Sequence, residues 1–183
     1  MIEDVAQRVR ELRATQGLSL EALAHRSGVS RSMISVIERG ESSPTAVVLA
    51  KLAAGLSVSM ASLFETPQPE AEPMARRADQ RSWQDPESGY VRRNVSPSGV
   101  ASPIHIVEIS FPPQARVAYE TGAPQVRVHQ QVWVLDGSLE VTVGEERYRL
   151  ATGDCLAMVL DRPIVFHNPA RKVTRYVVVT AAG

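Results

Sequence analysis

The hydrophobic periodicity changes once along this chain of 183 residues, and that change constrains its fold more than any other feature. Up to Phe64 the apolar residues recur at helical spacing, as Val5, Val9 and Leu12 do. From Tyr90 onward they alternate with polar residues in short runs rich in Val, Ile and aromatic residues. We therefore predict an α+β protein made of two domains, with helices in the first and only strands in the second.

A proline-containing segment of low apolar content separates the two patterns. It begins with "TPQPEAEP" and is expected to form a semi-extended linker. The predicted organisation is a helical domain over residues 1–65, a linker over residues 66–89 and an all-β domain over residues 90–183.

Cap residues divide the first domain into five predicted short helices. Gly28 and Gly40 follow the second and third segments, where a left-handed glycine often ends a helix. Pro44 suits the first position of the fourth segment, because its missing N–H has no helical partner there. Serine side chains can cap the free backbone N–H groups at the starts of the last four segments, namely Ser19, Ser30, Ser43 and Ser59.

The composition restricts the partners and the compartment of the protein. Lys and Arg number 20 and Asp and Glu number 20, so any DNA-binding surface must be a local patch. The single cysteine, Cys155, excludes an intramolecular disulfide, and its apolar surroundings predict a buried thiol. No apolar run is long enough to span a membrane, and the N-terminus lacks the pattern of a signal peptide. We expect a cytoplasmic protein without membrane contact.

The third helical segment carries a positive charge where the helix dipole disfavours one. Arg31 occupies the first helical position, which favours a carboxylate, and Ser30 and Ser32 flank it. Insertion of this end into the major groove of DNA explains the arrangement, because a guanidinium pairs with guanine or phosphate. The helix N-terminus also offers backbone N–H groups to an anion.

Three sequence elements, "LAHRSGVS", "ISVIERGESSPT" and "LAKLAAGLSV", stand in order without gaps. With them the first 64 residues resemble the Xre, or phage-repressor-type, helix-turn-helix family. The resemblance implies an internal pair between Glu38 and Arg13. It also implies base-facing positions at Ser30, Arg31, Ser32 and Ser35, and positions near the DNA backbone at Ser19, Ser43 and Thr45.

Two further residues of this domain have alternative interpretations. Met33 either packs inward or touches a thymine methyl group, and Arg39 either reaches a phosphate or serves only as a last-turn cation. Both stay among the predicted DNA-binding residues.

The second domain resembles the cupin small barrel. The elements that carry the resemblance are "VLDGSLEVTVG", the pair Gly153–Asp154 and "RPIVFHNP". Metal-binding cupins place three histidines and a glutamate at fixed distances from these elements. Here the glutamate place falls at Gln130 and the last histidine place at Ile164, and residues 123–126 contain no histidine. We therefore predict no catalytic residues, no metal and no cofactor.

A barrel without metal ligands leaves a cavity suited to a small molecule. Arg127 and His129 are expected to point outward unless a bulge turns them inward, in which case Arg127 would clamp a carboxylate. Trp133 and Tyr176 are interpreted as packing or interface residues. The inward-facing or wall positions implied by the cupin pattern are Val126, Val128, Gln130, Val132, Ile164, Phe166, Met158 and Tyr119.

Together the two halves resemble the Xre–cupin transcription regulators. That resemblance implies a sequence-specific DNA-binding protein that is not an enzyme. It also implies a homodimer on a pseudo-palindromic double-stranded operator, and a small-molecule effector bound in the cupin domain. Two other hypotheses remain open. One is a cupin metalloenzyme with a DNA-binding appendage, and the other is a DNA-binding protein whose barrel only dimerises.

Overall fold

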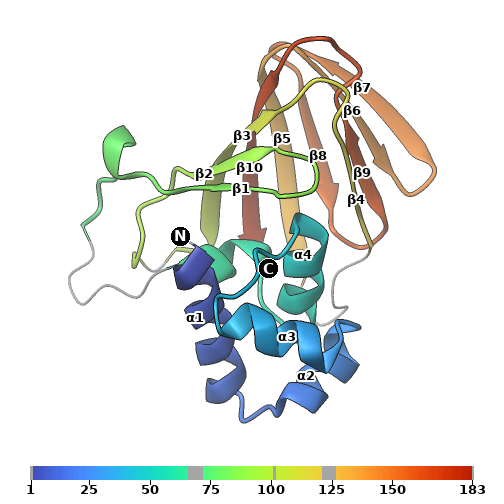
Figure 1. Cartoon of the computed structure of the whole chain (residues 1–183). Helices are drawn as coiled ribbons and strands as arrows, with labels where there is room; N and C mark the ends of the chain where they lie inside the picture. Colours follow the sequence, from blue (N-terminus) through green and yellow to red (C-terminus); the bar gives the residue numbers. More distant parts are fainter. Residues whose placement is uncertain (1, 66–71, 101, 121–126, 183) are drawn as a thin grey trace.

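The computed structural model of the protein describes residues 2–65, 72–100, 102–120 and 127–182. Helices occupy one end of the molecule and strands the other, as the two periodicities predict (Figure 1). The helical domain contains the α-helices α1 (Ile2–Thr15), α2 (Leu20–Ser27), α3 (Arg31–Glu38) and α4 (Ala46–Gly55).

The prediction of five α-helices is wrong for the last segment. Residues Met60–Phe64 form a 3-10 helix, η1, because five residues are too few to form the repeated hydrogen bonds of an α-helix. Ser59 nevertheless caps it, by accepting a hydrogen bond from the N–H of Ser62. The cap of α4 is also corrected: Thr45, not Ser43, holds the N-cap, and Pro44 precedes the helix.

The helix-turn-helix unit is held by a small apolar core. Gly28 links α2 to α3 with a φ of 68°, a left-handed conformation that glycine adopts without strain. Leu23, Ile34, Ile37 and Leu49 are fully buried between the helices. Helix α3 is thereby fixed by its apolar face and exposes its opposite face to solvent.

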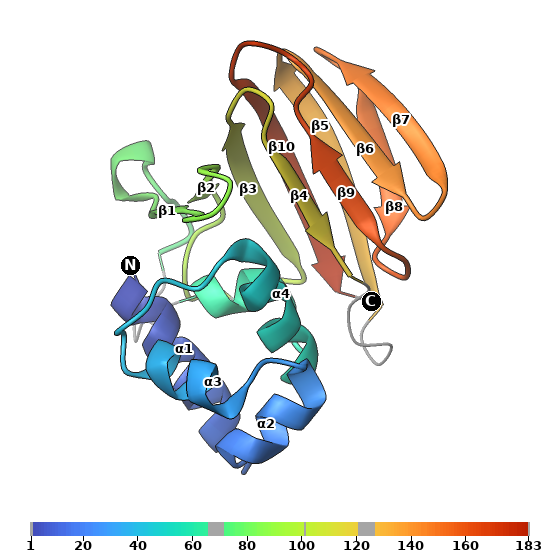
Figure 2. The same ribbon diagram turned by 45° about the vertical axis from the view of Figure 1, so that its right-hand side comes forward.

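The strand domain is a jelly roll of two sheets that face each other (Figure 2). One sheet has the order β1-β2-β3-β10-β5-β8 and the other has the order β4-β9-β6-β7. Strands β3 to β10 form the jelly roll, the architecture of cupins. The strands are β1 (Ser82–Gln84), β2 (Val91–Asn94), β3 (Ile104–Phe111), β4 (Arg116–Tyr119), β5 (Val128–Asp136), β6 (Ser138–Val143), β7 (Glu146–Ala151), β8 (Cys155–Val159), β9 (Ile164–His167) and β10 (Thr174–Ala182).

The expected closed barrel is corrected to this pair of sheets. Within the described residues no ladder of backbone hydrogen bonds joins one sheet to the other. The two sheets instead enclose the core between their inner faces, as sheet-on-sheet packing allows.

The β1–β2 hairpin connects the sheet to the helical domain, and β1 lies within the segment predicted as a linker. The hairpin follows the 3-10 turn η2 (Arg77–Asp79). The Trp83 ring lies 5.7 Å from the Phe64 ring of η1. Asp85 is buried, and its Oδ1 accepts a hydrogen bond of 2.8 Å from the N–H of Ala46 at the start of α4. The two domains therefore share a packed junction.

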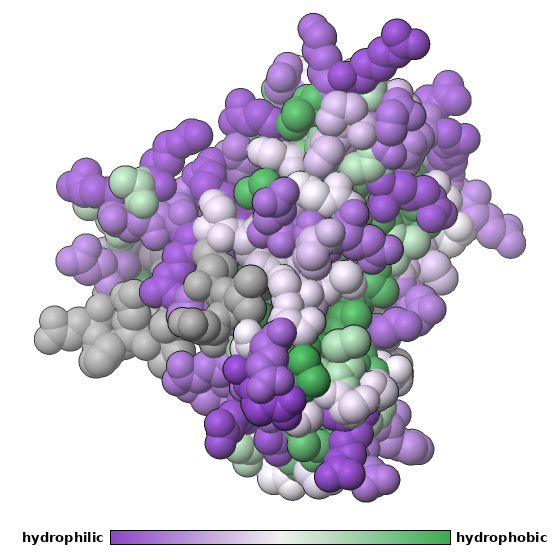
Figure 3. Space-filling view, viewed as in Figure 1, coloured by the Kyte–Doolittle hydropathy of each residue, from purple (hydrophilic) through white to green (hydrophobic). Residues whose placement is uncertain are grey.

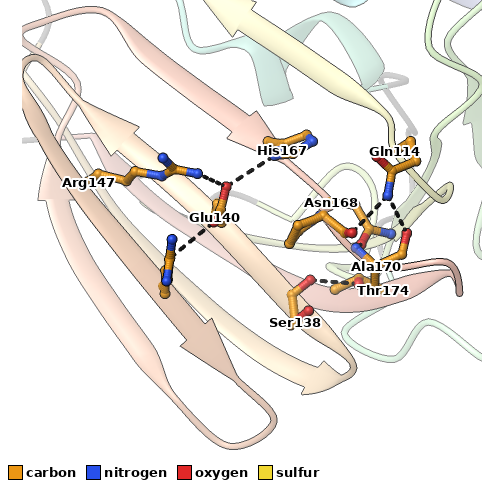
Figure 4. A network of polar contacts seen from close by, with 10 residues as sticks. Gln114, Ser138, Glu140, Arg147, His167, Asn168, Ala170 and Thr174 are labelled. Carbon is orange, nitrogen blue, oxygen red and sulfur yellow. Dashed lines mark hydrogen bonds and ion pairs between the residues drawn. The ribbon is translucent and has the colours of Figure 1, made fainter.

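The "HNP" element has a structural role in the turn between β9 and β10. Asn168 is fully buried, and its Nδ2 donates to the carbonyl oxygens of Phe111, Pro112 and Lys172. Figure 4 shows this turn beside the polar network of Glu140, whose carboxylate accepts hydrogen bonds from Arg147 and Arg149 and lies 3.1 Å from Nδ1 of His167.

Cys155 is exposed, which contradicts the predicted buried thiol. It pairs with Trp133 in the register of β5 and β8, and Trp133 is exposed on the outer face of the six-stranded sheet. The apolar neighbours of Cys155 in sequence alternate between the two faces, so its apolar surroundings along the chain do not bury it. No helix in the described ranges has the length and apolar character needed to cross a bilayer.

Candidate DNA-recognition helix and interdomain cavity

The N-terminus of α3 is an exposed polar surface, on the part of the helical domain away from the strands (Figure 1). Ser30 is the N-cap, and its Oγ accepts a hydrogen bond of 3.2 Å from the N–H of Met33. The hydroxyl of Ser32 lies 3.2 Å from that of Ser30. Arg31 begins the helix, as predicted, and no hydrogen bond or ion pair among the described residues engages its guanidinium. This end of α3 therefore presents one unpaired cation and two hydroxyl groups.

Met33 belongs to the exposed face of α3. Its side chain is 42% exposed, whereas Ile34 and Ile37 on the core face are fully buried. Of the two interpretations of Met33, the structure favours the one in which it can touch DNA.

Arg39 is not free for a phosphate in this structure. Its Nε and Nη2 donate to both carboxylate oxygens of Glu41, and its Nη1 donates to Ser35. The hydrogen bond from Arg39 lowers the pKa of Glu41. A phosphate contact from Arg39 would have to replace this carboxylate pair, so its predicted DNA contact carries a cost that Arg31 does not have.

The internal pair implied by the family resemblance is present. Arg13 Nε lies 2.6 Å from Oε1 of Glu38 and Nη2 lies 2.8 Å from Oε2, a bidentate ion pair between α1 and α3. Arg13 also donates to the carbonyl of Leu18, so the pair fixes α1, the start of α2 and α3 together.

The remaining predicted backbone contacts lie at helix starts. Ser19 is exposed and caps α2, with its Oγ accepting from the N–H of Ala22. Thr45 and Ser43 are half-buried before α4. Ser19 and Thr45 are the N-caps of α2 and α4. The N-terminus of each helix offers backbone N–H groups that suit a phosphate.

A cavity of about 780 Å³ lies between the two sheets and extends to the helical domain. Its helical wall comes from the end of α2, from α4 and from η1, with Ser27, Lys51 and Met60 among the lining residues. Five predicted wall residues line it: Tyr119, Val128, Gln130, Ile164 and Phe166. The volume lies within the range of small-molecule sites.

The other predicted ligand residues lie elsewhere. Burial alternates along β5, so His129 is exposed while Gln130 and Val132 are buried. Val132 lies outside the cavity lining, as does Met158, whose sulfur is 4.0 Å from Nε2 of Gln130. Arg127 is exposed and no bulge turns it inward, whereas Val126 lies outside the described residues.

The polar part of the cavity wall was not among the ligand residues predicted from the sequence. Four residues line the cavity there: Tyr90 directly before β2, Arg92 on β2, and Tyr176 and Thr180 on β10. The hydroxyl groups of Tyr90 and Tyr119 lie 3.2 Å apart. Burial raises the pKa of both, so they stay neutral and can donate hydrogen bonds. Residues two apart in an extended segment share a face, so Tyr90 and Arg92 could be grouped from the sequence, but the sequence did not show that their face lines the cavity.

The cavity residues do not fit a cupin metal centre. Gln130 and Ile164 lie in its wall at the places of two metal ligands. No cluster of three or more His, Cys, Asp or Glu residues with the geometry of a metal site occurs in the described part of the chain. We therefore assign no step to a metal.

Comparison with known proteins finds a matching helix-turn-helix domain and similar transcription regulators. Residues 9–63 match the helix-turn-helix family model HTH_3. The HTH-type transcriptional regulator SutR of Escherichia coli K12 is 28% identical over 175 residues, which cover 92% of this chain and 89% of SutR. Residues 9–63 therefore form a helix-turn-helix domain, and the chain is similar to HTH-type transcriptional regulators over most of its length. The strand domain that follows has the jelly-roll architecture found in cupins.

Solved structures agree with this architecture. The crystal structure of an HTH_3 family transcriptional regulator from Vibrio cholerae superposes on the present chain with a TM-score of 0.78 and 25% identity. The match covers 98% of the present chain and 96% of the Vibrio cholerae chain. Fe(II)-HppE shares the fold with a TM-score of 0.51 and 16% identity. The match covers 97% of the present chain and 96% of the HppE chain. That second likeness concerns the fold alone.

Proposed function

We propose that a small molecule binds in the interdomain cavity and changes the affinity of the regulator for its operator. This proposal is carried by one observation, namely that residues of both domains line the cavity. The jelly roll supplies one part of the wall, and the helices α2, α4 and η1 supply the other. A ligand that fills the cavity contacts both domains at once. It therefore favours one of their relative arrangements, and a coupling of about 1–3 kcal/mol is typical of such linkage.

The contacts at the junction provide a route for that coupling. Asp85 binds the N-terminus of α4, and Lys51 of α4 lies 3.1 Å from the carboxylate of Glu120 after β4. Helix α4 also packs against α2, whose turn to α3 sets the position of the recognition helix. A shift of α4 on ligand binding would consequently move α2 and α3 relative to DNA.

We propose that α3 enters the major groove with Arg31 as its principal base-reading residue. Its exposed guanidinium can pair bidentately with guanine, and the neighbouring hydroxyl groups can contact a base edge or a phosphate. The proposed DNA-contacting set is Ser19, Ser30, Arg31, Ser32, Met33, Ser35, Arg39, Ser43 and Thr45.

A homodimer would place two such helices on a pseudo-palindromic operator, with half-sites about 34–36 Å apart. The outer face of the six-stranded sheet supports this proposal. Trp133, Ile104 and Ile106 are large apolar residues there that are 49%, 47% and 36% exposed. Most of the surface seen in Figure 3 is hydrophilic, with apolar residues only in small patches, so a face with these three side chains is a candidate for a second copy. Light scattering of the wild type and of Trp133→Ser tests it, with a dimer expected only for the wild type.

The operator is to be found first, by sequencing the genomic DNA fragments that the full-length protein retains at a stated salt concentration. Fluorescence anisotropy then measures binding to an enriched site, with and without the small-molecule fraction of a cell extract. We expect a few two-fold symmetric sites and a change in their affinity when the extract is added.

A cavity-filling variant shows whether such a response depends on the cavity. Val178 lines it on β10, so Val178→Phe should bind DNA but lose the response. Val173→Phe is the control, because Val173 is exposed in the turn before β10. A response retained in a folded Val178→Phe protein contradicts the sensing role. In that case the hypothesis of a domain that only dimerises gains support.

A further inference from the structure

Arg92 is a buried cation without an ionic partner. It is 8% exposed on β2 and forms no ion pair with any described residue, and the ring centroid of Phe64 lies 4.7 Å from its guanidinium carbon. Its Nε is buried and has no hydrogen-bond partner. Burial of an unpaired charge is costly, and here burial lowers the pKa of Arg92. Such a group needs a specific reason to be retained.

The neighbouring residue on the same strand, Arg93, is an arginine that does have an ionic partner. Arg93 points to the opposite face of β2 and forms an ion pair with Glu108 on β3. One arginine is thus neutralised within the protein, and the other faces the cavity with no carboxylate beside it.

The rest of the cavity wall has the same electrostatic bias. Among the described residues its lining contains the four basic residues Arg26, Lys51, Arg92 and Arg162 and one acidic residue, Glu120. Glu120 is exposed and already paired with Lys51 at 3.1 Å. Arg162 is paired with Asp161 at 2.8 Å, so Lys51 and Arg162 are both neutralised at the surface, and Arg92 is the buried cation of the wall.

Other polar groups of the wall also lack partners. The hydroxyl of Thr180 is buried without a hydrogen bond. Gln130 is its register partner on β5, and the only hydrogen-bond partner of that amide among the described residues is the sulfur of Met158 at 4.0 Å. Between this pair and Arg92 the register of β3 and β10 places the apolar lining residues Val107, Ile109 and Val178.

We infer that the ligand of this cavity is an organic carboxylate with an apolar body, whose carboxylate pairs with the guanidinium of Arg92. One guanidinium neutralises one carboxylate bidentately, whereas a phosphate monoester would leave about one further negative charge uncompensated in the apolar cavity. The tyrosine hydroxyl pair of Tyr90 and Tyr119 can donate a further hydrogen bond. The far end of the ligand would contact Gln130 and Thr180. This inference rests on the proposed effector site and names the chemical class of its ligand.

Thermal unfolding of the full-length protein tests the inference with matched probes. Hexanoate, benzoate and phenylacetate are compared with hexanamide, benzamide and phenylacetamide at constant ionic strength. A carboxylate at about 10 mM that binds with a Kd of about 1 mM should raise Tm by about 3–6 °C. The amides should leave Tm unchanged, because they cannot neutralise the guanidinium.

Three variants separate the role of Arg92 from a structural one. Arg92→Met should abolish the carboxylate effect, and its own Tm without ligand should equal or exceed that of the wild type, because an uncompensated charge is removed. Arg92→Lys keeps the charge without the planar fork and should retain part of the effect. Arg127→Met is the control, because Arg127 is exposed outside the cavity, and it should respond like the wild type.

The possible outcomes distinguish this inference from the proposed function. If amides stabilise the protein as well as carboxylates, or if Arg92→Met still responds, the carboxylate class is wrong while a ligand site remains. A lower Tm for Arg92→Met with an unchanged ligand effect would assign Arg92 a structural role and overturn the inference. If no carboxylate stabilises the wild type but the cell-extract fraction changes operator binding, the carboxylate class is again wrong and the sensing role stands. If neither the probes nor the extract has any effect, both proposals fail.

Discussion

Arg31 and Arg92 both lack an ionic partner among the described residues, but they differ in their surroundings. Arg31 is exposed at the start of α3, where water solvates its charge. Arg92 is buried in the wall of the interdomain cavity, away from bulk water, and its Nε is a buried atom without a hydrogen-bond partner. An unpaired charge on the surface costs little and is common, so Arg31 is informative only through its unfavourable place at a helix N-terminus. An unpaired buried charge is expensive, so Arg92 is informative by itself.

Arg13 completes the comparison, because it is a largely buried arginine that has its partner. Removal of that partner in Glu38→Ala should lower the free energy of unfolding by about 2–3 kcal/mol, since the Arg13 charge is left unpaired between α1 and α3. This is the largest effect that we expect on stability. Urea unfolding measures it, with Glu41→Ala as the control, because Glu41 is exposed with Arg39 and should have little effect. Equal losses of unfolding free energy in the two variants would show that burial does not determine how much each ion pair contributes to stability.

Arg31→Ala should weaken binding to the operator by about 1–3 kcal/mol and relax the preference at one base position. The stability of the protein should be unchanged or slightly higher, because no described residue pairs with the guanidinium and its charge is unfavourable at a helix N-terminus. Anisotropy titrations against the operator and against single-base variants measure both quantities. Arg149→Ala, at a side chain 79% exposed on the strand domain, is the matched control for the loss of one charge.

The salt dependence of the Arg31→Ala titrations distinguishes base contact from phosphate contact. If Arg31 binds only a phosphate, the loss of affinity is uniform across sequences and the slope of log K against log salt falls by about 1. Unchanged binding would remove Arg31 from the DNA-contacting set.

The smallest effect on stability is expected for Glu140→Gln. Glu140 lies on the outer face of the four-stranded sheet, and its carboxylate is paired with arginine side chains. Hydrogen bonds from Arg147 first and from His167 second lower the pKa of Glu140. A carboxylate with a lowered pKa in the folded state contributes stability above its unfolded pKa, and loses that contribution as pH falls through the folded value. The Tm difference between the wild type and Glu140→Gln should therefore be constant near neutral pH and shrink as the pH falls below about 4.5. A difference that grows on acidification would contradict this sign.

Much of the helical domain was predictable because its signals are local. The serine caps at Ser19 and Ser30 depend on a hydroxyl within three residues of the N–H groups that it satisfies. The family resemblance predicted the pair of Arg13 and Glu38 correctly. Errors occurred where neighbouring residues compete for one role, as Ser43 and Thr45 do for the cap of α4. They also occurred where a segment is too short for the predicted helix type.

In the strand domain, the alternation of residues along a single strand was predictable. The inward places of Val128, Gln130 and Val132 follow from a period of two once the phase of β5 is known. The cavity itself could not be predicted in this way. Its wall combines residues from α2, α4 and η1 with residues from both sheets, and no local pattern records that these segments meet.

The sequence by itself determined that this protein has a helix-turn-helix domain and an all-β domain, because periodicity and capping are local properties of the chain. Only the tertiary structure decided which of the adjacent residues Arg92 and Arg93 faces the cavity. Two identical side chains in succession cannot set the phase of a strand. The pairing of β2 with β3 turns Arg93 toward Glu108 and leaves Arg92 inside, without an ionic partner among the residues that the structure describes.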